Sequence, residues 1–172
     1  MKLFLNYWKA LTFALIKYGD LKRKSEDIHY FIHPLRITLI LRAAGFTEFD
    51  NENLMIAALF HDLIEDTDTS LSEIEKKFGK KVASIVSEVS IPIKAEKEKH
   101  LENLKNASVE AKIIKLADRL DNLIDLPLEA WSKDQQKSYA EQAKIILESC
   151  GDANSELALR LKQEIEKILI QN

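Results

Sequence analysis

Glycine, proline and cysteine are all scarce in this sequence of 172 residues, which contains four glycines, three prolines and one cysteine. Residues that interrupt helices are therefore rare, and the abundant Leu, Ile, Ala, Glu and Lys favour an all-helical fold. The single cysteine, Cys150, excludes an intramolecular disulfide and is typical of a reducing compartment. We therefore expect an all-α, cytoplasmic protein.

A strong charge imbalance and a long hydrophobic segment are also missing. The formal net charge is −3, so no general electrostatic attraction to nucleic acid or to an anionic membrane is indicated. Residues 1–16 are partly apolar, but Asn6, Trp8 and Lys9 interrupt them and predict an amphipathic helix rather than a signal peptide. No segment reaches the roughly 20 apolar residues that a membrane span needs. We expect neither nucleic acid nor a membrane as partner.

Helical periodicity predicts one domain over residues 1–172, built as a bundle of about eight to ten helices. Motif residues fall within about 14–125, and further helices are expected over 132–170. The last of these, 155–168, could close the core or form a dimer face, so the oligomeric state stays open. The residues expected to begin helices by capping them are Asp50, Ser70, Ser108 and Ser132.

Three helix boundaries bear on the candidate site. Glycine is expected to end the first helix near Gly19 and the second at Gly45. Pro34 suits the first turn of that second helix, which would leave His33 just outside it. Residues 94–106 are highly charged and give no clear boundary.

The segment 54–67 begins as an apolar run and then places His61, Asp62, Glu65 and Asp66 close together. As one continuous helix it would be apolar on every side and therefore buried. Burying a histidine and several carboxylates costs several kcal/mol unless they are paired or bind a metal. The segment therefore predicts half of a metal-dependent active site.

The candidate metal ligands are His33, His61, Asp62 and Asp118. Two imidazoles and two carboxylates form a mixed nitrogen and oxygen set that suits Mn²⁺, Fe²⁺ or Zn²⁺ better than Mg²⁺ or Ca²⁺. Such an ion lowers the pKa of its bound water and screens charge on a phosphoryl group. Glu65 and Asp66 would then be near enough to take a proton from that water.

Two of these residues have simpler interpretations. His33 could cap a helix or pack against Tyr30 and Phe31. In residues 113–124, Asp118 projects opposite the apolar stripe, so periodicity alone predicts a solvent-exposed side chain. Lys115 and Arg119 would pair with acidic neighbours and hold Asp118 in place.

The order His33, His61-Asp62, Asp118 resembles the HD phosphohydrolase superfamily. More narrowly, the chain resembles the hydrolase domain of the RelA/SpoT alarmone enzymes and their small stand-alone relatives. The matching strings are Arg23-Lys24, Tyr30-Phe31-Ile32-His33-Pro34, Ala57 through Thr67, Phe78 through Val82, and Ile114 through Leu123.

This resemblance implies functions for individual residues. It implies Mn²⁺ bound by the four candidate ligands, and water activated by Glu65 and Asp66. It also implies that Arg23, Lys24 and Asn122 bind the substrate. The implied reaction removes the 3′-pyrophosphate from (p)ppGpp and gives GDP or GTP and pyrophosphate.

The chain departs from these relatives around the substrate. Where relatives often have His-x-Gly-Gln it has Tyr18-Gly19-Asp20-Leu21, and where they have Val-Thr-Lys it has Val89-Ser90-Ile91. A second hypothesis therefore keeps the metal site but takes another phosphorylated nucleotide, such as a nucleoside phosphate or the 2′-phosphate of NADPH. A third is a non-catalytic helical module that binds metal or nucleotide.

Overall fold

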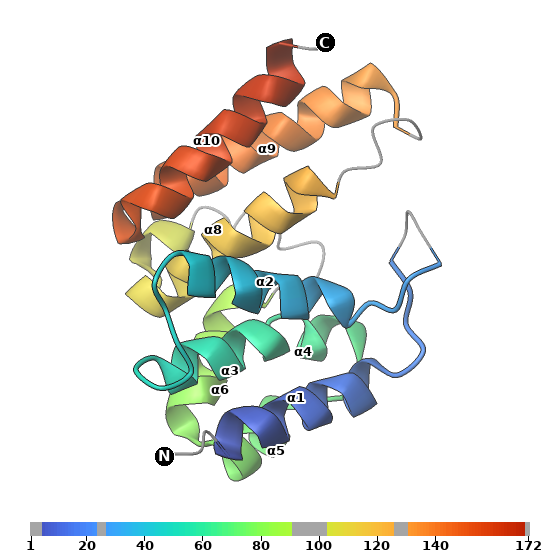
Figure 1. Cartoon of the computed structure of the whole chain (residues 1–172), viewed down its shortest axis with the longest axis vertical. Coiled ribbons are helices and arrows are strands. Elements are labelled where there is room, and N and C mark those ends of the chain that lie inside the picture. The colour runs from blue at the N-terminus through green and yellow to red at the C-terminus, as the bar shows by residue number, and fades with distance from the viewer. Residues whose placement is uncertain (1–4, 24–26, 91–102, 126–130, 171–172) are drawn as a thin grey trace.

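The computed structural model describes residues 5–23, 27–90, 103–125 and 131–170, which form α-helices, short 3₁₀ helices and turns (Figure 1). The α-helices are α1 (Leu5–Tyr18), α2 (Ile32–Ala43), α3 (Glu52–Phe60), α4 (Leu63–Asp66), α5 (Leu71–Phe78), α6 (Lys80–Val89), α8 (Val109–Ile124), α9 (Lys133–Cys150) and α10 (Ser155–Ile170). Across these residues the only extended pairing is an isolated bridge between Lys22 and His29. The predicted all-α fold is confirmed.

Helix α8 lies in the middle of the molecule (Figure 1). It packs on one side against α2, α3 and α6, and on the other side against α9 and α10. Helix α1 covers α3, and α5 packs against α6. None of the described helices is long and apolar enough to cross a membrane.

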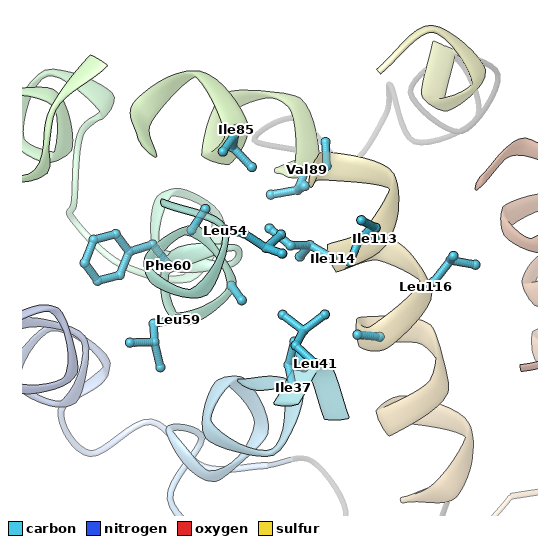
Figure 2. Close-up of a cluster of buried hydrophobic side chains, with 14 of the residues drawn as sticks. Ile37, Leu41, Leu54, Leu59, Phe60, Ile85, Val89, Ile113, Ile114 and Leu116 are labelled. Carbon is cyan, nitrogen blue, oxygen red and sulfur yellow. The ribbon is translucent and has the colours of Figure 1, made fainter. Parts of the chain in front are cut away.

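The hydrophobic core surrounds α3, whose residues from Leu54 to Phe60 are all buried. Figure 2 shows side chains from three neighbouring helices directed at it: Ile37 and Leu41 from α2, Ile85 and Val89 from α6, and Ile113 and Ile114 from α8. Helix α3 is therefore fixed from several directions at once. This packing places the chain immediately after Phe60 inside the protein.

Several predicted helix ends are confirmed. The hydroxyl of Ser132 accepts from the backbone N–H of Gln135, whose side chain accepts from Ser132 in turn, which completes a capping box. Ser70 and Ser108 also accept backbone N–H groups at the starts of α5 and α8. Gly45 follows α2 with φ 90°, a conformation that disfavours side chains with a Cβ.

Two other predicted boundaries are wrong. His33 is the second residue of α2, because Pro34 needs no hydrogen-bonded N–H in the first turn and the helix can begin before it. Asn51 rather than Asp50 occupies the N-cap position of α3, and its side chain makes no capping hydrogen bond there. Asp50 lies in the preceding turn, where it accepts a hydrogen bond from the Thr47 hydroxyl at 3.0 Å. Of the charged segment 94–106, residues 94–102 lie outside the described residues, and Leu104–Asn106 forms a 3₁₀ helix.

The C-terminal helix α10 closes the core. Its buried side chains are Leu157, Leu161, Ile165 and Ile168, which form an apolar stripe at helical spacing. The helix packs against both α8 and α9. Because α8 carries one of the candidate ligands, α10 supports the site from behind.

The packing of α10 can be tested with two leucines on the same helix. Leu161 is 0% exposed and Leu159 is 56% exposed. Leu161→Ala should lower the free energy of unfolding by about 2–5 kcal/mol, because it removes buried methyl groups and leaves a cavity. Leu159→Ala should change it by no more than about 0.5 kcal/mol. Urea unfolding followed by circular dichroism measures both; equal effects would contradict the packing described.

Candidate metal centre

The backbone breaks its helical pattern at His61 and Asp62. Helix α3 ends at Phe60 and α4 begins at Leu63, so the prediction of one continuous helix over 54–67 is wrong. The buried hydroxyl of Ser90 donates to the carbonyl oxygen of His61 at 2.7 Å. The N–H of Glu65 donates instead to the carbonyl of Asp62, at 3.1 Å. The break therefore has an identifiable partner, the residue that directly follows α6, and it lies at two of the proposed ligands.

All four predicted ligand side chains meet at one point between α2, the α3–α4 turn and α8. The Nε2 atoms of His33 and His61 are 3.2 Å apart. Asp62 Oδ2 lies 2.8 Å from His61 Nε2, and Asp118 Oδ1 lies 3.3 Å from His33 Nε2. The candidate ligand atoms of His33, His61 and Asp118 all lie within 4.8 Å of one another.

Hydrogen bonds to the other ring nitrogens fix how the two imidazoles face. His61 Nδ1 lies 2.9 Å from the carbonyl oxygen of Ala58, and His33 Nδ1 lies 2.6 Å from Asp121 Oδ2. Both partners can only accept, so each Nδ1 is assigned the proton. The two Nε2 atoms then direct lone pairs at each other, which requires a proton or a metal cation between them. The donor set and its orientation fit a metal ion.

The carboxylates around the imidazoles determine their charge. Burial disfavours the charged form of His33, but hydrogen bonds with Asp118 and Asp121 outweigh burial and raise its pKa to about 9. Burial also disfavours ionised Asp62, yet the neighbouring charge and hydrogen bond of His61 lower its pKa to about 2. For Asp118 the nearby ammonium of Lys115 likewise overcomes burial and holds the pKa well below its ordinary value. Asp62 and Asp118 are therefore ionised at neutral pH, the form in which a carboxylate binds a metal ion.

Asp118 is buried, with 7% exposure, although helical periodicity predicted a solvent-exposed side chain. The reason is that α8 is covered on both sides, so no face of it is left to solvent at this position. Lys115 Nζ lies 3.2 Å from Asp118 Oδ2, and Asn122 Nδ2 donates to Oδ1 at 2.6 Å. The expected pairing of Lys115 is confirmed. Arg119 instead places its guanidinium over the ring of Tyr139, 4.3 Å from the centroid.

The proposed catalytic carboxylates Glu65 and Asp66 lie on α4, which begins directly after the candidate ligand Asp62, and both are exposed. Their charges act on groups at the site, since Glu65 favours the charged form of Lys115 and Asp66 disfavours ionisation of Tyr30. Both carboxylates are therefore accessible to solvent and close enough to the candidate ligands to act on the groups around them.

Two of the proposed substrate residues lie together next to the ligands. Arg23 Nη2 donates to Asn122 Oδ1 at 3.1 Å, and the amide of Asn122 in turn contacts Asp118. Arg23 also forms an ion pair with Asp125 at 2.8 Å. Lys24 lies outside the described residues.

Sequence reasoning missed several residues that support the site. Tyr30 donates to Asp62 Oδ2 at 2.6 Å, and Asp121 orients His33. Asp121 was discoverable, because it follows Asp118 by three residues and so shares its face of a helix. The sequence pattern did not indicate Ser90, because its hydrogen bond to His61 joins two segments that are far apart in the chain.

Comparisons with known proteins agree with this geometry. A family model described as HD domain matches residues 10–148. The guanosine-3′,5′-bis(diphosphate) 3′-pyrophosphohydrolase MESH1 of Drosophila melanogaster is 33% identical over 166 residues, 92% of this chain and 92% of that protein. The Homo sapiens protein of the same name is 36% identical over 163 residues, 90% of this chain and 89% of its own length.

A solved structure has the same fold over almost the whole chain. It is described as a metazoan ortholog of SpoT that hydrolyzes ppGpp and plays a role in starvation responses. The TM-score is 0.88 at 31% identity, with 97% of each chain covered. The resemblance stated from the sequence motifs is confirmed.

Metal binding should release a proton from this site. With its pKa raised to about 9, His33 carries two protons near neutral pH, whereas a metal ligand must offer a free Nε2. Titration with Mn²⁺ by calorimetry, in two buffers of different ionisation enthalpy, should show release of about one proton per ion. His33→Ala should abolish this release, and His29→Ala, outside the cluster, should leave it unchanged. Binding without proton release would contradict the assigned charge state.

Proposed function

The chain belongs to the HD domain family, and we propose that it is a metal-dependent phosphohydrolase that removes the 3′-pyrophosphate of (p)ppGpp. The products would be GDP or GTP and pyrophosphate. The observation that carries this proposal is the convergence of His33, His61, Asp62 and Asp118 at one point with exposed carboxylates beside it. The names of the relatives that align over about nine-tenths of the chain supply the substrate class.

We propose Mn²⁺ as the ion, held by the four ligands. The mixed nitrogen and oxygen donors of the site fit that metal. When bound, the ion lowers the pKa of a water molecule and screens the negative charge of a phosphoryl group. The chain itself holds the ligands in place: Tyr30 orients Asp62, and Lys115 and Asn122 orient Asp118.

Glu65 and Asp66 are the proposed proton acceptors. The bond that breaks joins the 3′ oxygen of the ribose to the nearer phosphorus of the pyrophosphate, and water supplies the new oxygen. A carboxylate at the solvent side of the ligands can accept the proton of that water, and the departing 3′ oxygen takes up a proton. Because both side chains are exposed, they can exchange protons with solvent between turnovers.

Arg23 and Asn122 are the proposed substrate contacts. A nucleotide that touches Arg23 lies beside Asn122, which is one hydrogen bond from the ligand Asp118. The guanidinium provides a planar, permanently charged group suited to phosphate or to a base edge. Lys24, next in sequence, is proposed for the same role from the sequence motif.

The role of Glu65 can be separated from metal binding. Glu65→Gln should lower kcat by about 10²- to 10⁴-fold, the usual loss when a general base is removed, while Mn²⁺ affinity stays the same. Steady-state kinetics and calorimetry measure the two quantities. The matched control is Glu75→Gln, an exposed glutamate on α5 away from the ligands, which should leave kcat unchanged. A weaker Mn²⁺ affinity in Glu65→Gln would make this residue a ligand instead.

One panel tests the substrate. Purified protein with Mn²⁺ should release pyrophosphate from ppGpp and pppGpp, and Asp62→Ala should abolish the release. The same panel includes NADPH and common nucleotides. If the protein releases inorganic phosphate from NADPH and does not hydrolyse ppGpp, the substrate is NADPH and the proposed substrate is wrong. Metal binding without hydrolysis of any nucleotide would indicate a binding module.

A further inference from the structure

Behind the candidate ligands, a chain of ion pairs runs through Asp121, Arg36 and Asp125, residues that have no role in the proposed reaction. It starts at His33, whose Nδ1 lies 2.6 Å from Asp121 Oδ2. Asp121 is 3% exposed, so its charge needs compensation inside the protein. Arg36 supplies that compensation through two hydrogen bonds, from Nε to Oδ1 at 2.7 Å and from Nη2 to Oδ2 at 3.0 Å.

Arg36 reaches a second carboxylate as well. Its Nη2 lies 2.8 Å from Oδ2 of Asp125, the residue directly after the end of α8. The same oxygen of Asp125 accepts from Arg23, from Nη2 at 2.8 Å and from Nε at 3.2 Å. Two guanidinium groups therefore share one carboxylate, and Arg36 connects the carboxylate behind His33 with the carboxylate that holds Arg23.

The chain of contacts closes on the metal site. Arg23 donates to Asn122, and Asn122 donates to Asp118, the ligand that lies 3.3 Å from His33 Nε2. The path that began at one ligand, His33, thus ends at another. Between these two ligands the path contains two aspartates and two arginines, so their charges balance, and removing one arginine leaves a carboxylate with less compensation.

We propose that Arg36 is a positioning residue that fixes the imidazole of His33 and the guanidinium of Arg23 relative to each other, through Asp121 and Asp125. Arg36 contacts neither the metal nor the substrate in this account. It acts by orienting one metal ligand and one substrate-binding side chain at the same time. The inference rests on the proposed function for its substrate half, and on the geometry of the ligands alone for its metal half.

The chemistry of arginine suits this task. Contact with two carboxylates requires a rigid fork with several N–H donors in one plane. A lysine at this position keeps the positive charge but offers a single ammonium, which cannot bind both oxygens of Asp121 and also reach Asp125. The arrangement therefore depends on guanidinium geometry and not only on charge.

Arg36→Met tests the proposal through two separate readouts. Mn²⁺ affinity, measured by calorimetry, should weaken by about 10- to 100-fold, the usual cost of losing support behind a metal-binding histidine. KM for ppGpp should rise as well. Asp125 loses its contact with Arg36 in this variant and therefore holds Arg23 less firmly in place. Circular dichroism and thermal unfolding establish that the variant is folded.

Asp125→Asn separates the two halves. It removes the anion that holds Arg23 but leaves Asp121 with Arg36, so KM should rise while Mn²⁺ affinity changes little. Arg36→Lys should not return both Mn²⁺ affinity and KM to their wild-type values. Full recovery of both by lysine would show that charge alone suffices and would overturn the proposal.

Arg42→Met is the matched control. Arg42 lies on the same helix as Arg36 and forms an ion pair of 3.2 Å with the buried Glu48, away from the site. It should leave Mn²⁺ affinity and KM unchanged. Arg36→Met with wild-type Mn²⁺ affinity would overturn the proposal, and so would equal losses in both arginine variants. If the wild-type protein hydrolyses no nucleotide, the proposed function fails, whereas the Mn²⁺ measurements still decide the role of Arg36.

Discussion

Two imidazole nitrogens held 3.2 Å apart inside the protein, with carboxylates on either side, impose the main constraint on this structure. Backbone and carboxylate acceptors behind His33 and His61 take the protons on Nδ1 and leave the two lone pairs facing each other. Without a cation or an additional proton between them this arrangement is unfavourable. The surrounding elements maintain it: the buried hydroxyl of Ser90, directly after α6, stabilises the break at His61, and α8 supplies the balancing charges.

Helix α8 connects the chemistry with the substrate side. On α8, Asp118 lies in the ligand cluster and Asp121 contacts the back of His33. Asn122 on the same helix and Asp125 directly after it both contact Arg23. Because α9 and α10 cover the other side of α8, these polar groups cannot turn toward solvent there. The fold therefore keeps these carboxylates facing α2, where His33 and Arg36 compensate them.

The sequence predicted what depends on local pattern or on motif order. The all-α class, the capping serines and the apolar stripe of α10 follow from helical periodicity and hydrogen bonding within one segment. The exposure of Asp118 was predicted wrongly from periodicity, because burial of α8 on both sides depends on segments far away in the chain. The helix break at His61 also depends on a distant residue, Ser90. The roles of Glu65, Asp66, Arg23 and Lys24 are proposals that follow motif order.

The central claim is that one divalent cation lies among His33, His61, Asp62 and Asp118. Crystals grown with Mn²⁺ and measured by anomalous diffraction at the manganese edge test this most directly. We predict a single strong peak within coordination distance of the two Nε2 atoms, with both aspartates as ligands. A peak elsewhere on the protein, or none at this point in crystals that contain the ion, would contradict it.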